Sequence, residues 1–468
     1  MFARRRLSVP GPSMPSVKQA VSFGQNPYRY LAECRAAYGD VFTLQLPRDP
    51  VRVVACAPQD VKAIFALKAD EFRSDEISLH LNLGDQSVLF ADGERHRRKR
   101  QILAPPMHIA KLRTYAAAML RRTDDHLDAL QLDAPCTAFD LFRSITLDVI
   151  LETVFGVDPT STKGRSMTAH LVEWLETALT PGMFALSLAM RGTVLRRVLE
   201  RRTERAGQGD YGRGSSLPWR KVARAKADLL ALLRADVARC RSEGSRGRTD
   251  VLALLVDARY EDGEPMGEDD ILDQLVTMLV GGFETTTNTL VWALFHILRN
   301  PAALAGIQAE LAKTFGTEGL DENRCAELTY LDACIRESMR LSPISIAPTR
   351  ELTKPMSLSG HEIPAGTIVW PCIYLAQRRA ETWPDPERFD PQRFLGKHAP
   401  KSNVFFPYGG GRRRCIGATY AQFEMRIVMA RLFERCEFEL LTHEPSPEMV
   451  GLTVSPQDNL RVRLCARA

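Results

Sequence analysis

The 468-residue chain lacks the features that mark several large classes of protein. Its ten cysteines are scattered, with no CxxC pair and no cluster with histidine, which disfavours a disulfide framework or a structural zinc site. No apolar run reaches the roughly 20 residues of a transmembrane helix. The basic N-terminus is not followed by the apolar run of a secretory signal. We therefore expect a cytoplasmic protein without a transmembrane anchor, in which most thiols are inert.

Strong charge of one sign is also missing. The chain has 62 basic and 57 acidic residues and a net charge of +5, a balance too mild to indicate nucleic-acid binding. Segment 191–226 is strongly basic and includes Arg196, Arg197, Arg201 and Arg202. The pattern indicates a solvated helix face followed by a mobile loop. The alternative is that the segment binds an acidic partner or a membrane surface.

The periodicity of apolar residues predicts a mainly α protein with small β-sheets. Helical spacing is clear in four stretches, residues 107–130, 140–155, 225–240 and 269–300. Short strands bounded by Gly, Pro and Asp are predicted at residues 41–46, 51–55, 356–359, 367–371 and 436–441. Gly and Ser dominate residues 207–216, which predicts a loop between two helices.

The segment from Phe405 to Gly417 carries the most chemical information. Three consecutive glycines would let the backbone approach a flat ligand closely. Cys415 precedes a predicted helix, where backbone amides and the helix dipole favour the thiolate, the form of cysteine that binds iron. The alternatives are a glycine-rich loop with a buried cysteine and a phosphate-binding loop. The latter fails because no Lys-Ser or Lys-Thr follows the glycines.

This segment resembles the haem-binding motif of the cytochromes P450, in which an aromatic residue, Gly, Arg, Cys and Gly keep a fixed spacing. The corresponding residues of this chain are Tyr408, Gly411, Arg413, Cys415 and Gly417. The resemblance implies that Cys415 is the sulfur ligand of the iron of haem b and that Arg413 pairs with a haem propionate. Tyr408 departs from the phenylalanine usual in the family, which leaves the tuning of the iron open.

A second motif, Gly281 to Thr287, lies within the helical pattern of residues 269–300. Glycine inside a helix costs on the order of 1 kcal/mol relative to alanine, so the pair Gly281-Gly282 needs a reason. One reason is a helix crossing a planar cofactor, and the alternative is a helix contact lined with small residues. The Thr285 hydroxyl can bond the Gly281 carbonyl. The stretch resembles the family's distal motif, which implies Glu284 and Thr285 as catalytic acid and alcohol in proton delivery.

The resemblance also implies roles for two further groups of charged residues. Glu337 and Arg340 lie three residues apart on one predicted helix, a spacing common on solvated surfaces. The resemblance implies that they form a buried, structural ion triad with Arg388. It also implies a propionate site made of His96, Arg100 and Arg350, although composition alone favours a solvated basic turn around residues 92–100.

The resemblance covers nearly the whole chain and implies a single catalytic unit, residues 27–468, after an extension of residues 1–26. Haem would lie between the long distal helix and the loop that carries Cys415. The expected reaction inserts one atom of O2 into a hydrophobic substrate such as a fatty acid, terpenoid or macrolide-like compound. Electrons would come from a ferredoxin or flavodoxin with its reductase, as in soluble bacterial members. The substrate pocket would include Phe283, Ile344, Ile346 and Val454.

Three other functions are compatible with parts of the sequence. A haem protein that isomerises or dehydrates peroxides would need no electron donor, but the pair Glu284-Thr285 suits the protonation of O2. A non-catalytic haem sensor or electron carrier is disfavoured by the long apolar segments. A helical scaffold without haem would lack the red-shifted absorption that a thiolate-ligated haem shows with carbon monoxide.

Overall fold

The computed structural model describes residues 8–47, 50–73, 83–178, 183, 192–209, 218–400, 404–451 and 453–467. Within these ranges the protein is mainly helical with small sheets, as predicted. The loop predicted at residues 207–216 lies mostly outside them.

A five-stranded sheet forms one side of the protein and combines N-terminal strands with strands from after residue 349. Its strand order is β1-β2-β8-β5-β3, with β2 and β8 parallel and the other pairs antiparallel. The elements of this side are α1 (Ser16–Gln25), α2 (Pro27–Tyr38), β1 (Val41–Leu44), β2 (Arg52–Ala55), α3 (Pro58–Phe65), β3 (Phe72–Arg73), β5 (Arg350–Leu352), β6 (Met356–Leu358), β7 (His361–Ile363), β8 (Ile368–Pro371) and α16 (Ile373–Ala376).

Helices make up most of the remainder. They are α4 (Gly93–Leu103), α5 (Ile109–Leu112), α6 (Ala116–Asp128), α7 (Ala138–Phe155), α8 (Thr162–Ala178), α10 (Gly192–Gly207), α11 (Pro218–Glu243), α12 (Val251–Asp257), α13 (Glu268–Leu298), α14 (Pro301–Phe315), α15 (Thr329–Leu341) and α17 (Ala418–Arg435). The pattern predicted as one helix over residues 107–130 is divided into α5 and α6.

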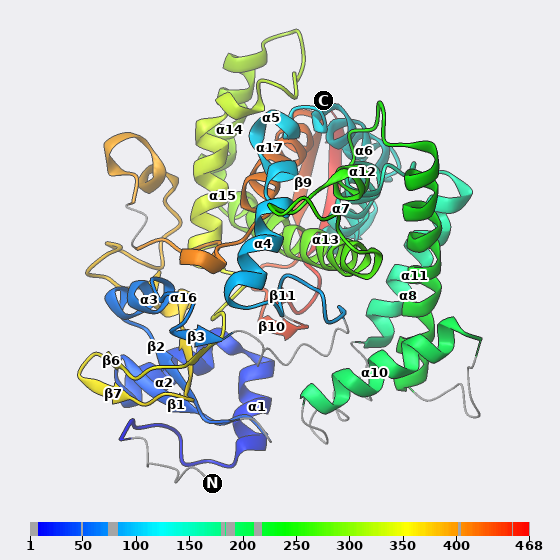
Figure 1. Cartoon of the computed structure of the whole chain (residues 1–468). Helices are drawn as coiled ribbons and strands as arrows, with labels where there is room; N and C mark the ends of the chain where they lie inside the picture. Colours follow the sequence, from blue (N-terminus) through cyan, green and yellow to red (C-terminus); the bar gives the residue numbers. More distant parts are fainter. Residues whose placement is uncertain are drawn as a thin grey trace.

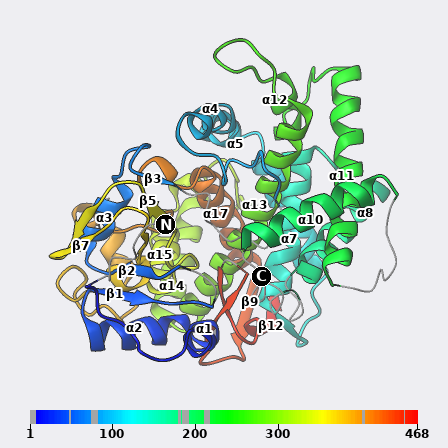
Figure 2. The same ribbon diagram turned by 60° about the horizontal axis from the view of Figure 1, so that its bottom comes forward.

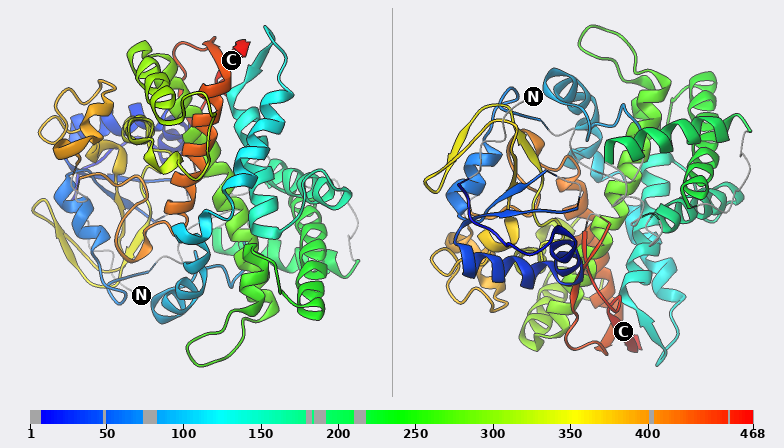
Figure 3. Two further views of the ribbon diagram at one scale, coloured as in Figure 1. Left: turned by 90° about the horizontal axis from the view of Figure 1, so that it is seen from above. Right: turned by 90° about the horizontal axis from the view of Figure 1, so that it is seen from below.

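Two small sheets complete the fold. Strand β12 (Arg461–Arg467) pairs with β4 (Pro135–Thr137) and with β9 (Cys436–Leu440), and the hairpin of β10 (Pro447–Val450) and β11 (Thr453–Pro456) packs against α13. Figures 1 and 2 show α13 between the five-stranded sheet on one side and α8, α10 and α11 on the other. The views from above and below in Figure 3 give the same arrangement. The core of the protein therefore surrounds α13.

The sequence of α13 explains its central position. Glu268, Asp269 and Asp270 occupy its first turn, where negative charge is favourable beside the helix dipole. From Ile271 onward apolar residues occur on all sides, as expected of a helix buried in a core. The helix continues without a break through Gly281 and Gly282. Among the described residues no single helix meets the length and hydropathy of a membrane span, and the pair α13 and α14 meets it only jointly, with a bend of 105°.

The predicted N-terminal extension is attached to the five-stranded sheet where it is described. The backbone N–H of Thr43 in β1 donates to the Pro10 carbonyl at 2.7 Å. Gln19 of α1 is buried, donates to the Met14 carbonyl at 3.0 Å and accepts from the Gln45 N–H at 3.0 Å. Residues 8–25 therefore cover one end of the sheet.

Helix α10 presents the basic segment as a solvated face. Leu195 and Leu199 are fully buried, whereas Arg197 and Arg201 are exposed. Arg196 lies 3.3 Å from Asp85 and packs over the ring of Phe90 at 4.7 Å. This arrangement agrees with the solvated helix face predicted from composition.

A fully buried ion pair anchors the segment that leads to the cysteine loop. Glu337 and Arg340 of α15 form two hydrogen bonds, of 2.7 and 2.8 Å, and neither side chain is exposed. Arg340 also donates to the backbone carbonyls of Gln377, Pro386 and Arg388. The buried charge is thus surrounded by hydrogen bonds from residues 377–390, as a buried ion requires.

The third member of this cluster is Arg393, and the prediction of Arg388 is wrong. Arg393 Nε lies 3.3 Å from Glu337 Oε1, and its side chain is only 11% exposed. The side chain of Arg388 is 64% exposed and binds Asp390 at 2.6 Å. The two arginines lie five residues apart, and each is followed by a phenylalanine. The turn Pro391–Phe394 directs the Arg393 side chain inward.

Gln377 connects this cluster to the cysteine loop. It is fully buried, and its side-chain carbonyl accepts a hydrogen bond from the Phe406 N–H at 2.8 Å. Its backbone carbonyl accepts one from Arg340 at 3.0 Å. Gln377 therefore links the ion pair to the start of the glycine-rich segment by two hydrogen bonds.

The two arginines provide a matched test. We expect Arg393→Met to destabilise the protein by about 2 kcal/mol, because it removes a charge-assisted contact from a buried carboxylate. Arg388→Met should leave stability unchanged, since that side chain is solvated. Thermal unfolding of both variants measures the difference, and an equal loss in the two would contradict the assignment.

Candidate functional site

The cysteine loop lies against α3, and this contact explains its glycines. Gly411 has a φ of +62°, and a Cβ at this position would lie 1.8 Å from the Phe65 carbonyl oxygen. A Cβ at Gly410 would lie 2.8 Å from the Phe65 side chain. The close approach that we expected toward a flat ligand is therefore, at these two glycines, an approach to α3.

Cys415 is positioned by the loop and by the start of α17. Its backbone N–H donates to the Tyr408 carbonyl at 3.0 Å, and α17 begins three residues later. Although part of the residue is exposed, desolvation by the surrounding protein raises the pKa of its thiol. The Gly417 N–H, Arg100 and Arg414 act in the opposite direction and do not overcome it. The predicted preference for the thiolate is therefore not met by the protein alone, but a bound metal ion deprotonates such a thiol.

Two buried polar groups, one on the cysteine loop and one on α17, have no hydrogen-bond partner among the described residues. The hydroxyl of Tyr408 is one, and its ring lies 5.8 Å from the guanidinium of Arg414. The carboxyl of Glu424 in α17 is the other, and burial raises its pKa well above the usual range. Burial therefore favours the protonated form of Glu424, a feature that the sequence pattern does not reveal.

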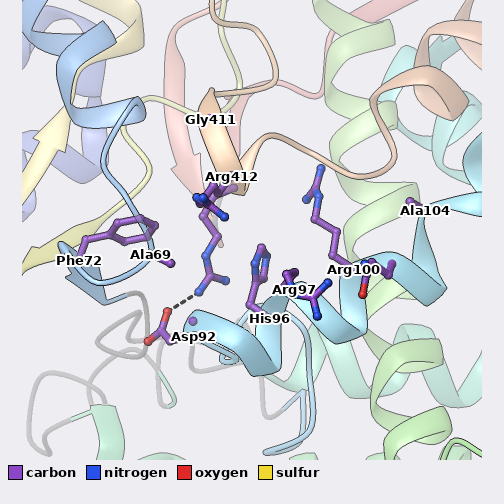
Figure 4. A pocket seen from close by; sticks show the side chains of 12 residues that line it. Ala69, Phe72, Asp92, His96, Arg97, Arg100, Ala104, Gly411 and Arg412 are labelled. Carbon is purple, nitrogen blue, oxygen red and sulfur yellow. Dashed lines mark hydrogen bonds and ion pairs between the residues drawn. The ribbon is translucent and has the colours of Figure 1, made fainter. Parts of the chain in front are cut away.

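A cavity of about 330 Å³ separates α4 from the cysteine loop. Figure 4 shows His96 and Arg100 pointing from α4 toward the segment with Gly411 and Arg412. The two α4 residues thus share a face, as their spacing of four predicts. Phe72 closes another side, and Arg350 of β5 lies over its ring at 5.0 Å.

Positive charge dominates this cavity. His96 is buried, and its pKa falls to about 3, first because of burial and then because of repulsion by Arg413, Arg100, Arg350 and Arg412. Burial and then Arg413 lower the pKa of Arg350 to about 10. Among the twelve described residues that line the cavity, Asp92 is the one carboxylate.

Arg413, predicted to pair with a propionate, is bound to the protein itself. Its guanidinium forms an ion pair with Asp92 and donates to the Ala91 carbonyl and, at 3.3 Å, to the Val88 carbonyl. It therefore joins the cysteine loop to the segment that precedes α4. Arg100 forms no ion pair among the described residues, so its charge is available to an anion in the cavity.

The pair predicted on the central helix has the expected local geometry. The Thr285 hydroxyl donates to the Gly281 carbonyl at 2.6 Å. A Cβ at Gly281 would meet no atom within 4 Å, whereas one at Gly282 would lie 2.7 Å from Ile150 of α7. Gly281 therefore leaves open space beside the helix, as a helix that crosses a planar cofactor requires. Gly282 instead allows the close contact of α13 with α7.

Glu284 is buried and lies against the hairpin of β10 and β11. Its Oε1 accepts a hydrogen bond from the Thr453 hydroxyl at 3.1 Å. Burial raises the pKa of Glu284 to about 7, and the Thr453 hydrogen bond opposes this rise. The carboxyl can therefore hold or release a proton near neutral pH. Neither Thr453 nor Asn288, which donates a hydrogen bond to it, belongs to a recognisable sequence motif. Only the fold therefore reveals this contact.

The four apolar residues predicted for the substrate pocket belong to the main hydrophobic core or pack against it. Val454 follows Thr453, is fully buried, and donates from its backbone N–H to the Ile344 carbonyl at 2.9 Å. Phe283 and Ile346 are buried in the same hydrophobic cluster, and Ile344 packs against it. The fold thus brings Val454 into contact with Ile344, which precedes it by 110 positions.

Buried positive charge beside a free thiol is the environment that an anionic, iron-containing cofactor requires. Comparison with known proteins identifies the class. The sequence profile of the family "Cytochrome P450" matches residues 8–209 and 213–463, and this chain belongs to that family. Its members are haem-thiolate monooxygenases, with haem iron bound by a cysteine.

Several relatives resemble the chain over nearly its whole length. Cytochrome P450 135B1 of Mycobacterium tuberculosis is 33% identical over 463 residues, which cover 98% of this chain and 91% of the relative. Cytochrome P450 135A1 of the same organism is 29% identical, with 97% and 94% covered. The solved structure "Retinoic acid bound cyanobacterial CYP120A1" superposes with a TM-score of 0.80 at 22% identity, covering 99% of this chain and 100% of that one. This confirms the predicted fold.

Proposed function

We propose that the protein is a monooxygenase that inserts one atom of O2 into a hydrophobic substrate, with electrons from a separate ferredoxin or flavodoxin and its reductase. The observation that carries the proposal is the buried acid Glu284 beside the Thr285 hydroxyl on the central helix. A haem isomerase of peroxides has no use for such a proton source.

The same proposal assigns the haem contacts. Cys415 provides the thiolate ligand on the loop, with Gly411, Gly417 and the Tyr408 ring around it. The bound haem supplies oxygen activation, which a thiolate ligand favours by donating electron density to the iron. His96 and Arg100 line the cationic cavity, and together with Arg350, which lies over the ring of Phe72, they would bind its carboxylates. Arg413 holds the loop through Asp92, next to that side.

Arg100 and Arg98 on α4 provide a test of the propionate site. Arg100 faces the cationic cavity, whereas Arg98 lies 2.5 Å from Asp262 on the far side of the helix. We expect Arg100→Met to lower haem retention by about tenfold, the loss of one charge-assisted contact to a carboxylate. Arg98→Met should retain haem like the wild type. Absorbance per protein after gel filtration measures retention, and equal retention in both variants would refute the assignment.

Glu284 is proposed as the proton donor and Thr285 as the hydroxyl that orients the proton's path. With a pKa of about 7, Glu284 is protonated below neutral pH and ionised above it. The Thr285 hydroxyl is held by the Gly281 carbonyl, so its oxygen remains free to accept a hydrogen bond. Proton delivery should therefore weaken as the pH rises through about 7.

The proposed substrate is apolar and of medium or large size, such as a fatty acid, a terpenoid or a macrolide-like compound. The buried side chains of Phe283, Ile346 and Val454 support this proposal. The retinoic acid bound to the structural neighbour, a largely apolar carboxylic acid, agrees with it. For the reductant, exposed Arg412 and Arg414 next to Cys415 favour an acidic partner protein.

A reconstituted assay tests the function directly. Purified protein with a ferredoxin, its reductase and a substrate that shifts the haem spin state should incorporate one 18O atom from 18O2. Glu284→Gln and Thr285→Val should lower product per electron by about a hundredfold, since proton transfer contributes about that much. Glu284→Gln should also abolish the loss of activity above pH 7. Turnover from a hydroperoxide alone, or reduction by the ferredoxin that is insensitive to salt, would contradict the respective parts of the proposal.

A further inference from the structure

The hydrogen bonds around Glu284 extend to a second element of the fold. The Thr453 hydroxyl donates to Glu284 Oε1 at 3.1 Å, and the Asn288 side chain donates to the Thr453 hydroxyl at 3.0 Å. Asn288 also donates to the Glu284 backbone carbonyl at 3.2 Å. A carbonyl can only accept, so this contact fixes which end of the Asn288 amide faces Thr453.

The hydroxyl of Thr453 has a second acceptor within reach. The Val450 carbonyl lies 3.3 Å away, at the other end of the hairpin turn. When Glu284 is ionised, the hydroxyl donates to the carboxylate. When Glu284 is protonated, the hydroxyl turns to Val450 and its oxygen accepts from the acid and from Asn288. A hydroxyl has one proton and two lone pairs, so both arrangements satisfy it.

The backbone directly after Thr453 is fixed by two hydrogen bonds. The next residue, Val454, donates its N–H to the Ile344 carbonyl at 2.9 Å and accepts a hydrogen bond from the Trp292 indole at 3.0 Å. Thr453 and Asn288 are 2% and 1% exposed, so bulk water does not compete for these bonds. The hydroxyl can therefore rotate while its oxygen stays in place.

We propose that Thr453 is a positioning residue for Glu284: the Thr453 hydroxyl, held by Asn288, rotates so that the acid can take up and release one proton while the carboxyl and the hydroxyl each keep a hydrogen-bond partner. This inference rests on the proposed role of Glu284 as proton donor. The hydroxyl keeps its own proton throughout, and no electrons move.

No charged side chain contributes to the pKa of Glu284 among the described residues; burial and Thr453 account for it. The titratable group on the packed hairpin is Glu448, opposite Ser455, and burial and Asp458 raise its pKa. A change at Thr453 should thus act on Glu284 through the hydrogen bond alone. Loss of a hydrogen bond to a carboxylate, about 1.5 kcal/mol, corresponds to an upward shift of about one pH unit.

Infrared spectroscopy measures this shift without turnover. The carbonyl stretch of protonated Glu284, isolated by subtracting the spectrum of Glu284→Gln, gives its titration midpoint in the haem-loaded protein. We expect Thr453→Val, which keeps the shape and removes the hydroxyl, to raise the midpoint by about one unit. Thr453→Ser should restore it. Ser455→Ala is the control, because the Ser455 hydroxyl is buried in the same strand and has no partner among the described residues.

The assay of coupled turnover completes the test. Thr453→Val should move the fall of product per electron at high pH upward by about one unit, because the acid then stays protonated to higher pH, and Thr453→Ser should restore the wild-type profile. A midpoint in Thr453→Val equal to that of the wild type would overturn the inference. If Glu284→Gln turns over like the wild type, the proposed donor role of Glu284 fails, and the catalytic part of this inference fails with it. The infrared midpoint tests the hydrogen bond of Thr453 to Glu284, whereas the turnover of Glu284→Gln tests the donor role, so the two failures can be told apart.

Discussion

The buried pair of Glu337 and Arg340 imposes the constraint on which the cysteine loop depends. Neither charge reaches water, so every remaining donor and acceptor has to be satisfied by protein. The partners come from residues 377–393, a segment without long helices or strands. Gln377 then binds Phe406 at the entrance to the loop. A segment with little regular structure is thus fixed by hydrogen bonds to one ion pair.

The candidate site also combines two environments of opposite character. On the side of α4, arginines gather with little acid to balance them, and His96 stays neutral there. On α13, burial without a neighbouring cation keeps Glu284 close to half protonated at neutral pH. The first environment suits an anionic cofactor, and the second suits a proton donor. Both depend on groups withdrawn from water, which strengthens their interactions.

Sequence patterns predicted many of the helices and strands, because local periodicity and spacing specify them. Helix α7 and the hydrogen bond of Thr285 to Gly281 were predicted correctly. Local patterns could not choose between Arg388 and Arg393, since both precede phenylalanine and only the turn at Pro391 distinguishes them. They also gave no sign of Thr453, which reaches Glu284 from 169 positions away. Contacts of that kind depend on tertiary packing.

The central claim is that Cys415 is the thiolate ligand of a haem in this protein. The reduced protein under carbon monoxide should show the strongly red-shifted Soret band of a thiolate-ligated haem, and Cys415→Ser should abolish it. Cys465→Ser, which changes the other exposed cysteine, should leave the band unchanged. A wild-type protein without the red-shifted band, or a Cys415→Ser variant that keeps it, would contradict the account.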